Sequence, residues 1–149
     1  MRKLNLPEYP FTVRRQDNRL FIFDEFRKKW LVLTPEEWVR QHLLMFLTRQ
    51  KGYPVSLIAI EKQVKVNQLP QRFDAVIYTP NGAPLAIIEC KASNVPIDEN
   101  TINQILRYNA VIQAPLLILS NGINTYCATV NFKEHSFSFL EDIPSYKKE

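Results

Sequence analysis

The stretch Gln71–Ser93, QRFDAVIYTPNGAPLAIIECKAS, decides the fold, because it reads as two apolar strands joined by a tight turn. Asn-Gly between two apolar runs is the strongest short-range signal for a β-hairpin. With Asn81-Gly82 at the centre of the turn, Asp74 of the first strand lies directly opposite Glu89 of the second. Directly opposed residues of an antiparallel pair have Cβ atoms about 4.5–5.5 Å apart. The sequence therefore predicts two carboxyl groups side by side.

This pairing depends on the register of the hairpin. Pro80 has no N–H and does not fit an ideal two-residue turn. A symmetric four-residue loop keeps the two acids opposite each other, whereas a one-residue bulge separates them. A second alternative pairs the acids with Arg72 and Lys91 as ordinary ion pairs. In either alternative, the acids are near each other in the sequence pattern by chance, and the chain is an α/β domain without a functional site at this place.

Two opposed carboxylates repel and destabilise a sheet unless something neutralises them. The two candidates are a hard divalent cation with oxygen ligands and a shared proton. Because strand residues alternate between faces, Glu89 and Lys91 share one face, while Ile88 and Cys90 share the other. Two acids beside an ammonium group predict a Mg²⁺ site with an adjacent base or charge stabiliser.

Length and composition narrow the number of domains, the class of protein and the kinds of partner. The 149 residues predict one domain over 1–149, and 46% apolar with 23% charged residues is typical of a globular protein. Cys90 and Cys127 lie in apolar runs without zinc-site spacing, so we expect buried thiols. No apolar run has the length of a membrane span and no signal peptide is visible, so we expect a cytoplasmic protein without a membrane partner. The net charge of +4 permits a nucleic-acid partner.

Periodicity and capping residues predict the remaining elements. Thr34 is the expected N-cap of a helix, with Pro35 at its first position, Glu37 completing a capping box, and Gly52 ending it. The other elements are an extended arm over 1–13, strands over 20–26 and 30–33 around a basic turn, a strand over 57–66 in which Ile58, Ile60, Lys62 and Val64 share a face, a helix over 99–113 capped by Asp98 or Asn100, strands over 115–119 and 123–132, and a last strand with Phe137 and Phe139.

This order predicts a mixed α/β (α+β) fold, in which helices flank a mixed sheet and a β-hairpin precedes them. The hairpin, the helix over 99–113 and the buried strand after it predict a right-handed parallel crossover. The core spans about 31–122, and the segments 1–13 and 145–149 are expected to be extended or flexible.

At these residues the chain resembles the PD-(D/E)xK nuclease superfamily, and most closely the N-terminal nuclease domain of type I restriction enzyme R subunits. The resemblance covers most of Leu31 to Gly122. It is carried by Asp74, by Glu89-Cys90-Lys91 as the E-x-K end of a strand, by Gln104 to Tyr108 as the Q-x-x-x-Y motif of the RecB-like branch, and by the phrases LTPEEWVRQHLL, RFDAVIY, PLAIIECKAS and LSNG.

The resemblance implies a restriction-endonuclease-like fold and Mg²⁺-dependent hydrolysis of DNA phosphodiesters, with Mn²⁺ able to substitute. Asp74, Glu89 and the backbone carbonyl of Cys90 would ligate the metal. Lys91 would orient or deprotonate the attacking water, and a glutamate of the first helix would join, with Glu37 preferred to Glu36. The remaining positions are Gln104 in the catalytic site and Arg72, Arg107, Tyr108 and Lys62 in contact with DNA.

The chain departs from the family pattern in two ways. Phe73 stands where the motif's name has proline, at a position that varies. The 149 residues also contain no Gly-rich loop with a lysine for ATP phosphates, so we expect no translocase activity. The expected partners are DNA and either a second copy or other restriction and defence subunits. The alternative function is a non-catalytic nucleic-acid-binding or assembly module that retains the nuclease fold.

Overall fold

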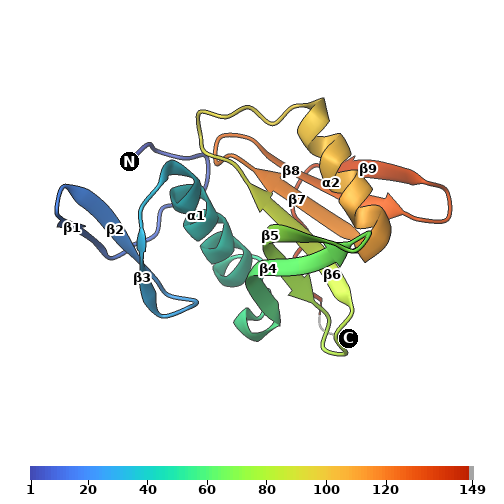
Figure 1. Cartoon of the computed structure of the whole chain (residues 1–149), viewed down its shortest axis with the longest axis horizontal. Helices are drawn as coiled ribbons and strands as arrows, with labels where there is room; N and C mark the ends of the chain where they lie inside the picture. Colours follow the sequence, from blue (N-terminus) through green and yellow to red (C-terminus); the bar gives the residue numbers. More distant parts are fainter. Residues whose placement is uncertain (148–149) are drawn as a thin grey trace.

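The computed structural model describes residues 1–147, which form two β-sheets and two principal helices (Figure 1). The smaller sheet has the order β1-β2-β3 and the larger one the order β4-β5-β6-β7-β8-β9. In chain order the elements are β1 (Val13–Gln16), β2 (Arg19–Asp24), β3 (Lys29–Val32), α1 (Pro35–Arg49), a short 3₁₀ turn (Val55–Leu57), β4 (Ile58–Val66), β5 (Leu69–Tyr78), β6 (Pro84–Cys90), α2 (Glu99–Ile112), β7 (Leu116–Ser120), β8 (Thr125–Asn131) and β9 (Ser136–Leu140).

The larger sheet is mixed, as predicted. β6 and β7 pair in parallel with Ile88 beside Ile118, and the other neighbouring strands of this sheet are antiparallel. Helix α2 is the crossover between the two parallel strands. Every residue of β7 is buried, as expected for a strand covered on both faces.

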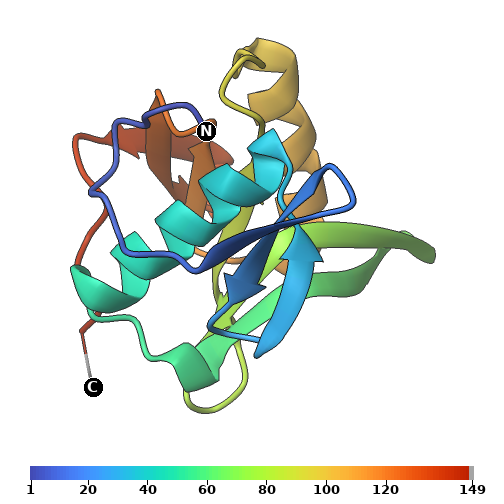
Figure 2. The same cartoon turned by 90° about the vertical axis from the view of Figure 1, so that its left-hand side faces the viewer.

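The two helices cover opposite faces of this sheet, as the two views in Figures 1 and 2 show. Helix α1 contributes Val39, Leu43 and Leu47 to one buried cluster, together with Ala75 and Ile88 of the sheet. On the other face, α2 contributes Ile105 to a second cluster that includes Phe73, Val76, Ile87, Leu117 and Leu119.

The central hairpin has the predicted register, but its turn is centred on other residues than predicted and is followed by a bulge. Its loop is a turn in which the N–H of Gly82 donates to the carbonyl of Thr79 at 2.9 Å, so Pro80-Asn81 rather than Asn81-Gly82 forms the centre. Gly82 then takes φ +89°, which glycine adopts at no steric cost. Beside this turn Tyr78 pairs with Pro84 instead of Leu85, one residue away from the predicted register. A bulge after Tyr78↔Pro84 restores it, so Ile77 pairs with Ala86 and Ala75 with Ile88.

The pairing of β4 with β5 is irregular beside Asp74. Glu61 has φ +53°, and its pairing with Asp74 is missing between the pairs Ile60↔Ala75 and Lys62↔Phe73. Ile60 therefore packs on the α1 side and Val64 on the α2 side. The prediction that Ile60 and Val64 share one face was wrong, because alternation assumes an unbroken extended backbone.

Both helix starts follow the predicted capping chemistry, with one exception. The Thr34 hydroxyl accepts from the N–H of Glu37 at 3.0 Å, and the Asp98 carboxylate accepts from that of Thr101 at 2.9 Å. The capping box at Thr34 is only half formed, because the carboxylate of Glu37 binds Arg40 instead of the backbone of Thr34. A buried guanidinium is a stronger partner for a carboxylate than a backbone amide.

The two ends of the chain are more ordered than predicted. Leu4 is buried, and the N–H of Asn5 donates to Gly122 at 2.7 Å. Strand β1 was not predicted, because VRRQ is an exposed edge strand without apolar alternation. Near the other end, Tyr146 donates its N–H to Lys51 at 2.7 Å. The flexibility expected for 148–149 lies outside the described residues.

Candidate functional site

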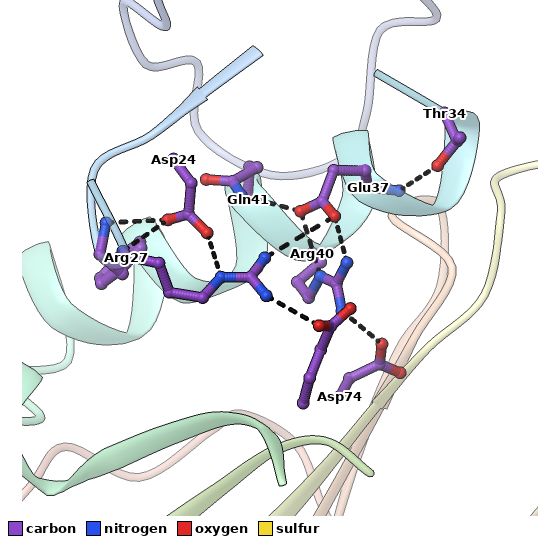
Figure 3. Close-up of polar contacts among 9 residues, drawn as sticks. Asp24, Arg27, Thr34, Glu37, Arg40, Gln41 and Asp74 are labelled. Carbon is purple, nitrogen blue, oxygen red and sulfur yellow. Dashed lines mark hydrogen bonds and ion pairs between the residues drawn. The ribbon is translucent and has the colours of Figure 1, made fainter. Parts of the chain in front are cut away.

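The predicted acids line a depression of about 340 Å³ where α1, β4, β5 and β6 come together. Asp74 enters it from β5, Glu89 from the end of β6, and Glu36 from the first turn of α1. Figure 3 shows Arg40 of the same helix between Glu37 and Asp74, in contact with both carboxylates. The start of the first helix and the central hairpin therefore form one site.

The side chains of Asp74 and Glu89 each accept a hydrogen bond from a backbone N–H of the other residue's strand. Oδ2 of Asp74 accepts the N–H of Cys90 at 2.7 Å, and Oε1 of Glu89 accepts the N–H of Asp74 at 3.1 Å. The two carboxyl groups consequently lie side by side, as the predicted register requires. A bulge that would separate them is excluded by these contacts.

The pKa values of both Asp74 and Glu89 are raised in this arrangement, with burial as the largest cause. Burial, followed by the negative charge of Asp74, raises the pKa of Glu89 to about 8. Burial also raises the pKa of Asp74 to about 6, although the N–H of Cys90 and the charge of Arg40 act to lower it. Near neutral pH, Glu89 therefore holds a proton that a cation would displace.

Arg40 is the positive charge nearest to Asp74. Its Nη1 lies 3.3 Å from Asp74 Oδ1 and 3.2 Å from Glu61 Oε1. Nε donates to Glu37 Oε2 at 3.1 Å, and Nη2 makes a further close contact with the same carboxylate. Burial alone would lower the pKa of Arg40, but its hydrogen bond with Glu37 and the surrounding charges raise it instead. Arg40 is thus a permanent cation held among three acids.

A second arginine connects the smaller sheet to this site. Arg27, in the turn between β2 and β3, donates from Nε to the buried Asp24 at 2.6 Å (Figure 3). Its Nη1 donates to Glu61 at 2.9 Å. Its Nη2 is buried without a hydrogen-bond partner, 4.0 Å from Glu37. Asp24 accepts two backbone N–H groups of the turn, from Phe26 at 2.8 Å and from Arg27 at 3.2 Å, and so fixes its shape.

Sequence reasoning missed the roles of these residues. Arg40 follows Glu37 by one helical turn, a spacing that often forms an ion pair and could have indicated this contact. Arg27 gave no such signal for its contact with Glu61, because Glu61 belongs to a different sheet.

The two glutamates of the first helical turn have different environments. Glu37 is only 5% exposed, and its carboxylate is occupied by Arg40 and by the Gln41 amide at 2.8 Å. Glu36 is exposed and lines the same depression as Asp74 and Glu89, and its charge contributes to raising both of their pKa values.

A smaller depression on the α2 side brings together Lys91, Gln104 and Tyr108 with Glu89 and Arg72. The Gln104 amide donates to the Tyr108 hydroxyl at 3.0 Å, so this pair on the helix is preformed. Glu89 and Arg72 line both depressions, which makes the two one continuous site.

Two predicted DNA contacts lie apart from these acids. Lys62 is exposed on β4 and lines neither depression. Arg107 belongs to a shallow surface along α2 that shares Thr101 and Gln104, but neither acid, with the smaller depression. The Cys90 thiol is fully buried in the cluster under α1, where burial raises its pKa well above the usual value. Only the backbone of Cys90 is therefore available to the site.

The donor set of the site suits a hard cation that retains water ligands. Within residues 1–147, no three His, Cys, Asp or Glu side chains form a preassembled metal-binding group. Two adjacent carboxylates are nevertheless present, and Mg²⁺ usually binds through one or two carboxylates while keeping several waters. The residues thus fit Mg²⁺ better than a metal that needs a complete protein cage.

Neither of the two helices is long and apolar enough to cross a membrane, a finding limited to residues 1–147.

Comparison with known proteins gives a consistent family relationship. Residues 35–144 match the family described as "Type I restriction enzyme R protein N terminus (HSDR_N)". A search of curated proteins found no match. Among solved structures, the fold is similar to a fragment of a protein assigned as an HsdR subunit of a type I restriction enzyme from Vibrio vulnificus YJ016, with a TM-score of 0.54 and 16% identity. The alignment covers 76% of this chain and 24% of that one. The chain belongs to the family of type I restriction enzyme R protein N termini.

Proposed function

We propose that this protein is a Mg²⁺-dependent deoxyribonuclease of the PD-(D/E)xK type. The observation that carries the proposal is the linked pair of Asp74 and Glu89, whose pKa values of about 6 and about 8 reflect two acids held together without full neutralisation. A fold that served only to hold two strands together would gain stability by replacing one of them. Lys91 lines the same depression as Glu89, which adds a cation where a phosphate would bind.

The residues divide the chemistry among them. Asp74, Glu89 and the carbonyl of Cys90 would hold Mg²⁺, which supplies Lewis-acid polarisation of a phosphoryl oxygen when bound. Lys91 orients the attacking water and stabilises the charge that develops on the phosphate. Gln104 and Tyr108 line the smaller depression together with Glu89 and Lys91, and the exposed Arg72 attracts the phosphate backbone. Partner subunits of a restriction enzyme would supply target choice.

Within the first helix, we assign the acid that faces the metal to Glu36. Glu37 is already neutralised by Arg40, whereas Glu36 lines the depression and is exposed. The matched variants Glu36→Gln and Glu37→Gln test this assignment. Glu36→Gln should weaken Mg²⁺ binding at unchanged stability, while Glu37→Gln should lower the free energy of unfolding. The reverse result would return the role to Glu37.

The direct test is cleavage of linear and supercoiled duplex DNA, single-stranded DNA and branched DNA with Mg²⁺, Mn²⁺ or EDTA. Asp74→Asn, Glu89→Gln and Lys91→Met should each lower the rate by at least about 100-fold, because each removes a group that touches metal or phosphate. Lys133→Met and Glu134→Gln, in the exposed turn between β8 and β9, are the matched controls. Wild-type activity that survives all three site variants would refute the site.

One observation favours a non-catalytic nucleic-acid-binding module as the second candidate. Arg40 already supplies a cation 3.3 Å from Asp74, so this acid has a protein partner without any metal. This candidate predicts salt-sensitive DNA binding, no cleavage of any substrate, and no stabilisation of the fold by Mg²⁺.

A further inference from the structure

The smaller sheet has an outer face on which arginines and aromatic rings alternate. The pairing places Arg14 beside Phe21 and Phe23 beside Trp30. Directly paired residues share a face, as do residues two apart on one strand, so these four side chains and Arg19 share one face. The opposite face carries Ile22 and Asp24, which are fully buried. The aromatic face is therefore the outer one, and we call it the β1–β3 outer face.

The arginines of this face are stacked on its rings. The guanidinium carbon of Arg14 lies 4.1 Å from the centre of the Trp30 ring, and that of Arg19 lies 5.8 Å from the Phe21 ring. The Phe23 and Trp30 rings meet edge to face at 5.4 Å. The three rings are half-buried and belong to neither core cluster of the larger sheet. They form a layer of their own, with Arg14 over Trp30 and Arg19 over Phe21.

The charge of this region matches an anionic ligand. Residues 13–32 contain six Lys or Arg and three Asp or Glu, a net charge of +3, whereas the whole chain has +4. Arg14, Arg15, Arg19 and Lys29 are exposed. Exposed cations beside flat aromatic rings are the combination that binds single strands, since rings stack on bases while cations contact phosphates. Duplex DNA hides the faces of its bases and could use only the cations.

The same sheet is connected to the acidic site. Arg27, which leaves its β2–β3 turn, reaches Glu61 at 2.9 Å, and the buried Asp24 anchors that turn. Figure 1 shows the sheet beside α1, the helix whose first turn lines the acidic depression. The smaller sheet is therefore attached to the acidic site through its β2–β3 turn.

From this geometry we propose that the β1–β3 outer face is a binding site for single-stranded DNA, in which Trp30, Phe21 and Phe23 stack on unpaired bases and Arg14 and Arg19 move from the rings to phosphates. The choice of DNA over RNA rests on the proposed deoxyribonuclease function; the choice of a single strand rests on the rings alone.

Binding is measured by fluorescence anisotropy with a labelled oligo(dT) of about 20 nucleotides, a duplex of the same length and an oligo(U), all in EDTA so that cleavage plays no part. The wild type should bind oligo(dT) most tightly, with an affinity that falls as salt rises. Trp30→Ala should weaken oligo(dT) binding by roughly 5- to 150-fold, the range for one lost base stack. Lys133→Ala, which removes a distant exposed charge, should change the affinity less than about twofold.

Two further variants separate stacking from charge and guard against misfolding. Arg14→Lys keeps the charge on an exposed edge strand and should keep most of the binding, while Trp30→Phe should retain part of the stacking. The chain has only two tryptophans, so Trp38→Phe leaves Trp30 as the sole tryptophan, and its emission should be quenched when oligo(dT) binds.

Several results would overturn the proposal: absence of oligo(dT) binding, duplex binding of equal or greater strength, an unchanged affinity in a folded Trp30→Ala protein, or unquenched Trp30 emission. Tighter binding of oligo(U) would overturn the assignment to DNA. Because no metal is present, these outcomes are independent of the cleavage assay: a protein that binds oligo(dT) without cleaving DNA refutes only the nuclease.

Discussion

Replacing Glu89 by glutamine should stabilise this protein at alkaline pH. The pKa of Glu89 rises from 4.5 to about 8 in the fold, through burial first and the charge of Asp74 second. Because the folded pKa lies above the unfolded one, the folded protein binds more protons than the unfolded chain between about pH 4.5 and 8. Over that window the contribution of Glu89 to the free energy of unfolding of the wild type therefore falls as pH rises.

The magnitude follows from the same values. A tenfold change in proton affinity corresponds to ~1.4 kcal/mol, so the rise from 4.5 to about 8 corresponds to a loss on the order of 5 kcal/mol once Glu89 is fully ionised. Glutamine keeps the shape and an oxygen that can accept the N–H of Asp74, but it never ionises. The stability difference between Glu89→Gln and wild type should be small at pH 5 and grow by a few kcal/mol by pH 9.

The assay is urea unfolding followed by tryptophan fluorescence at pH 5, 6.5, 8 and 9, in EDTA, with Glu134→Gln as the exposed control. Taking the difference between variant and wild type cancels the groups that titrate alike in both proteins, and leaves the titration of Glu89 together with its coupling to Asp74. A difference that stays constant from pH 5 to 9 would refute the reasoning, because it would mean that Glu89 ionises without cost. Saturating Mg²⁺ at pH 8 should remove most of the advantage of the variant, since the cation compensates the wild-type charge.

Three further predictions concern the same region and its support. Mg²⁺ at 100 times its dissociation constant should raise the free energy of unfolding of the wild type by roughly 2.7 kcal/mol, seen as a higher melting temperature, and should leave Asp74→Ala unchanged. Arg40→Met should destabilise the fold by about 3–5 kcal/mol in urea unfolding, because Glu37 is left buried without a cation; adding Glu37→Gln should recover part of the loss, and no recovery would show that the pair is not coupled. Gly122→Ala should cost roughly 1–3 kcal/mol in the same assay, because the new Cβ would lie 2.7 Å from Leu4 Cδ2 at φ +83°; full tolerance would contradict the packing of the N-terminal arm.

Much of the candidate site was predictable because it depends on local rules. An apolar run, a turn and a second run place Asp74 opposite Glu89, and helical spacing puts Gln104 next to Tyr108. The start of α1 was also local, since Thr34 caps the helix whatever it packs against. Even so, the hairpin register was right for a partly wrong reason, because a bulge near Pro84 compensated for a turn centred one position earlier.

What the sequence by itself determined was the presence of two adjacent acids, a lysine beside them and helices on either side of a mixed sheet. Only the tertiary structure decided which charges surround those acids. Arg40 and Asp74 are 34 positions apart, as are Arg27 and Glu61, and long flexible side chains meet across such separations only when three elements pack in one orientation. The same packing sets Glu37 against Arg40 and leaves Glu36 facing the depression, although the two are neighbours in sequence. Strand and helix periodicity describe each element alone, whereas burial beside a particular partner is a property of the whole fold.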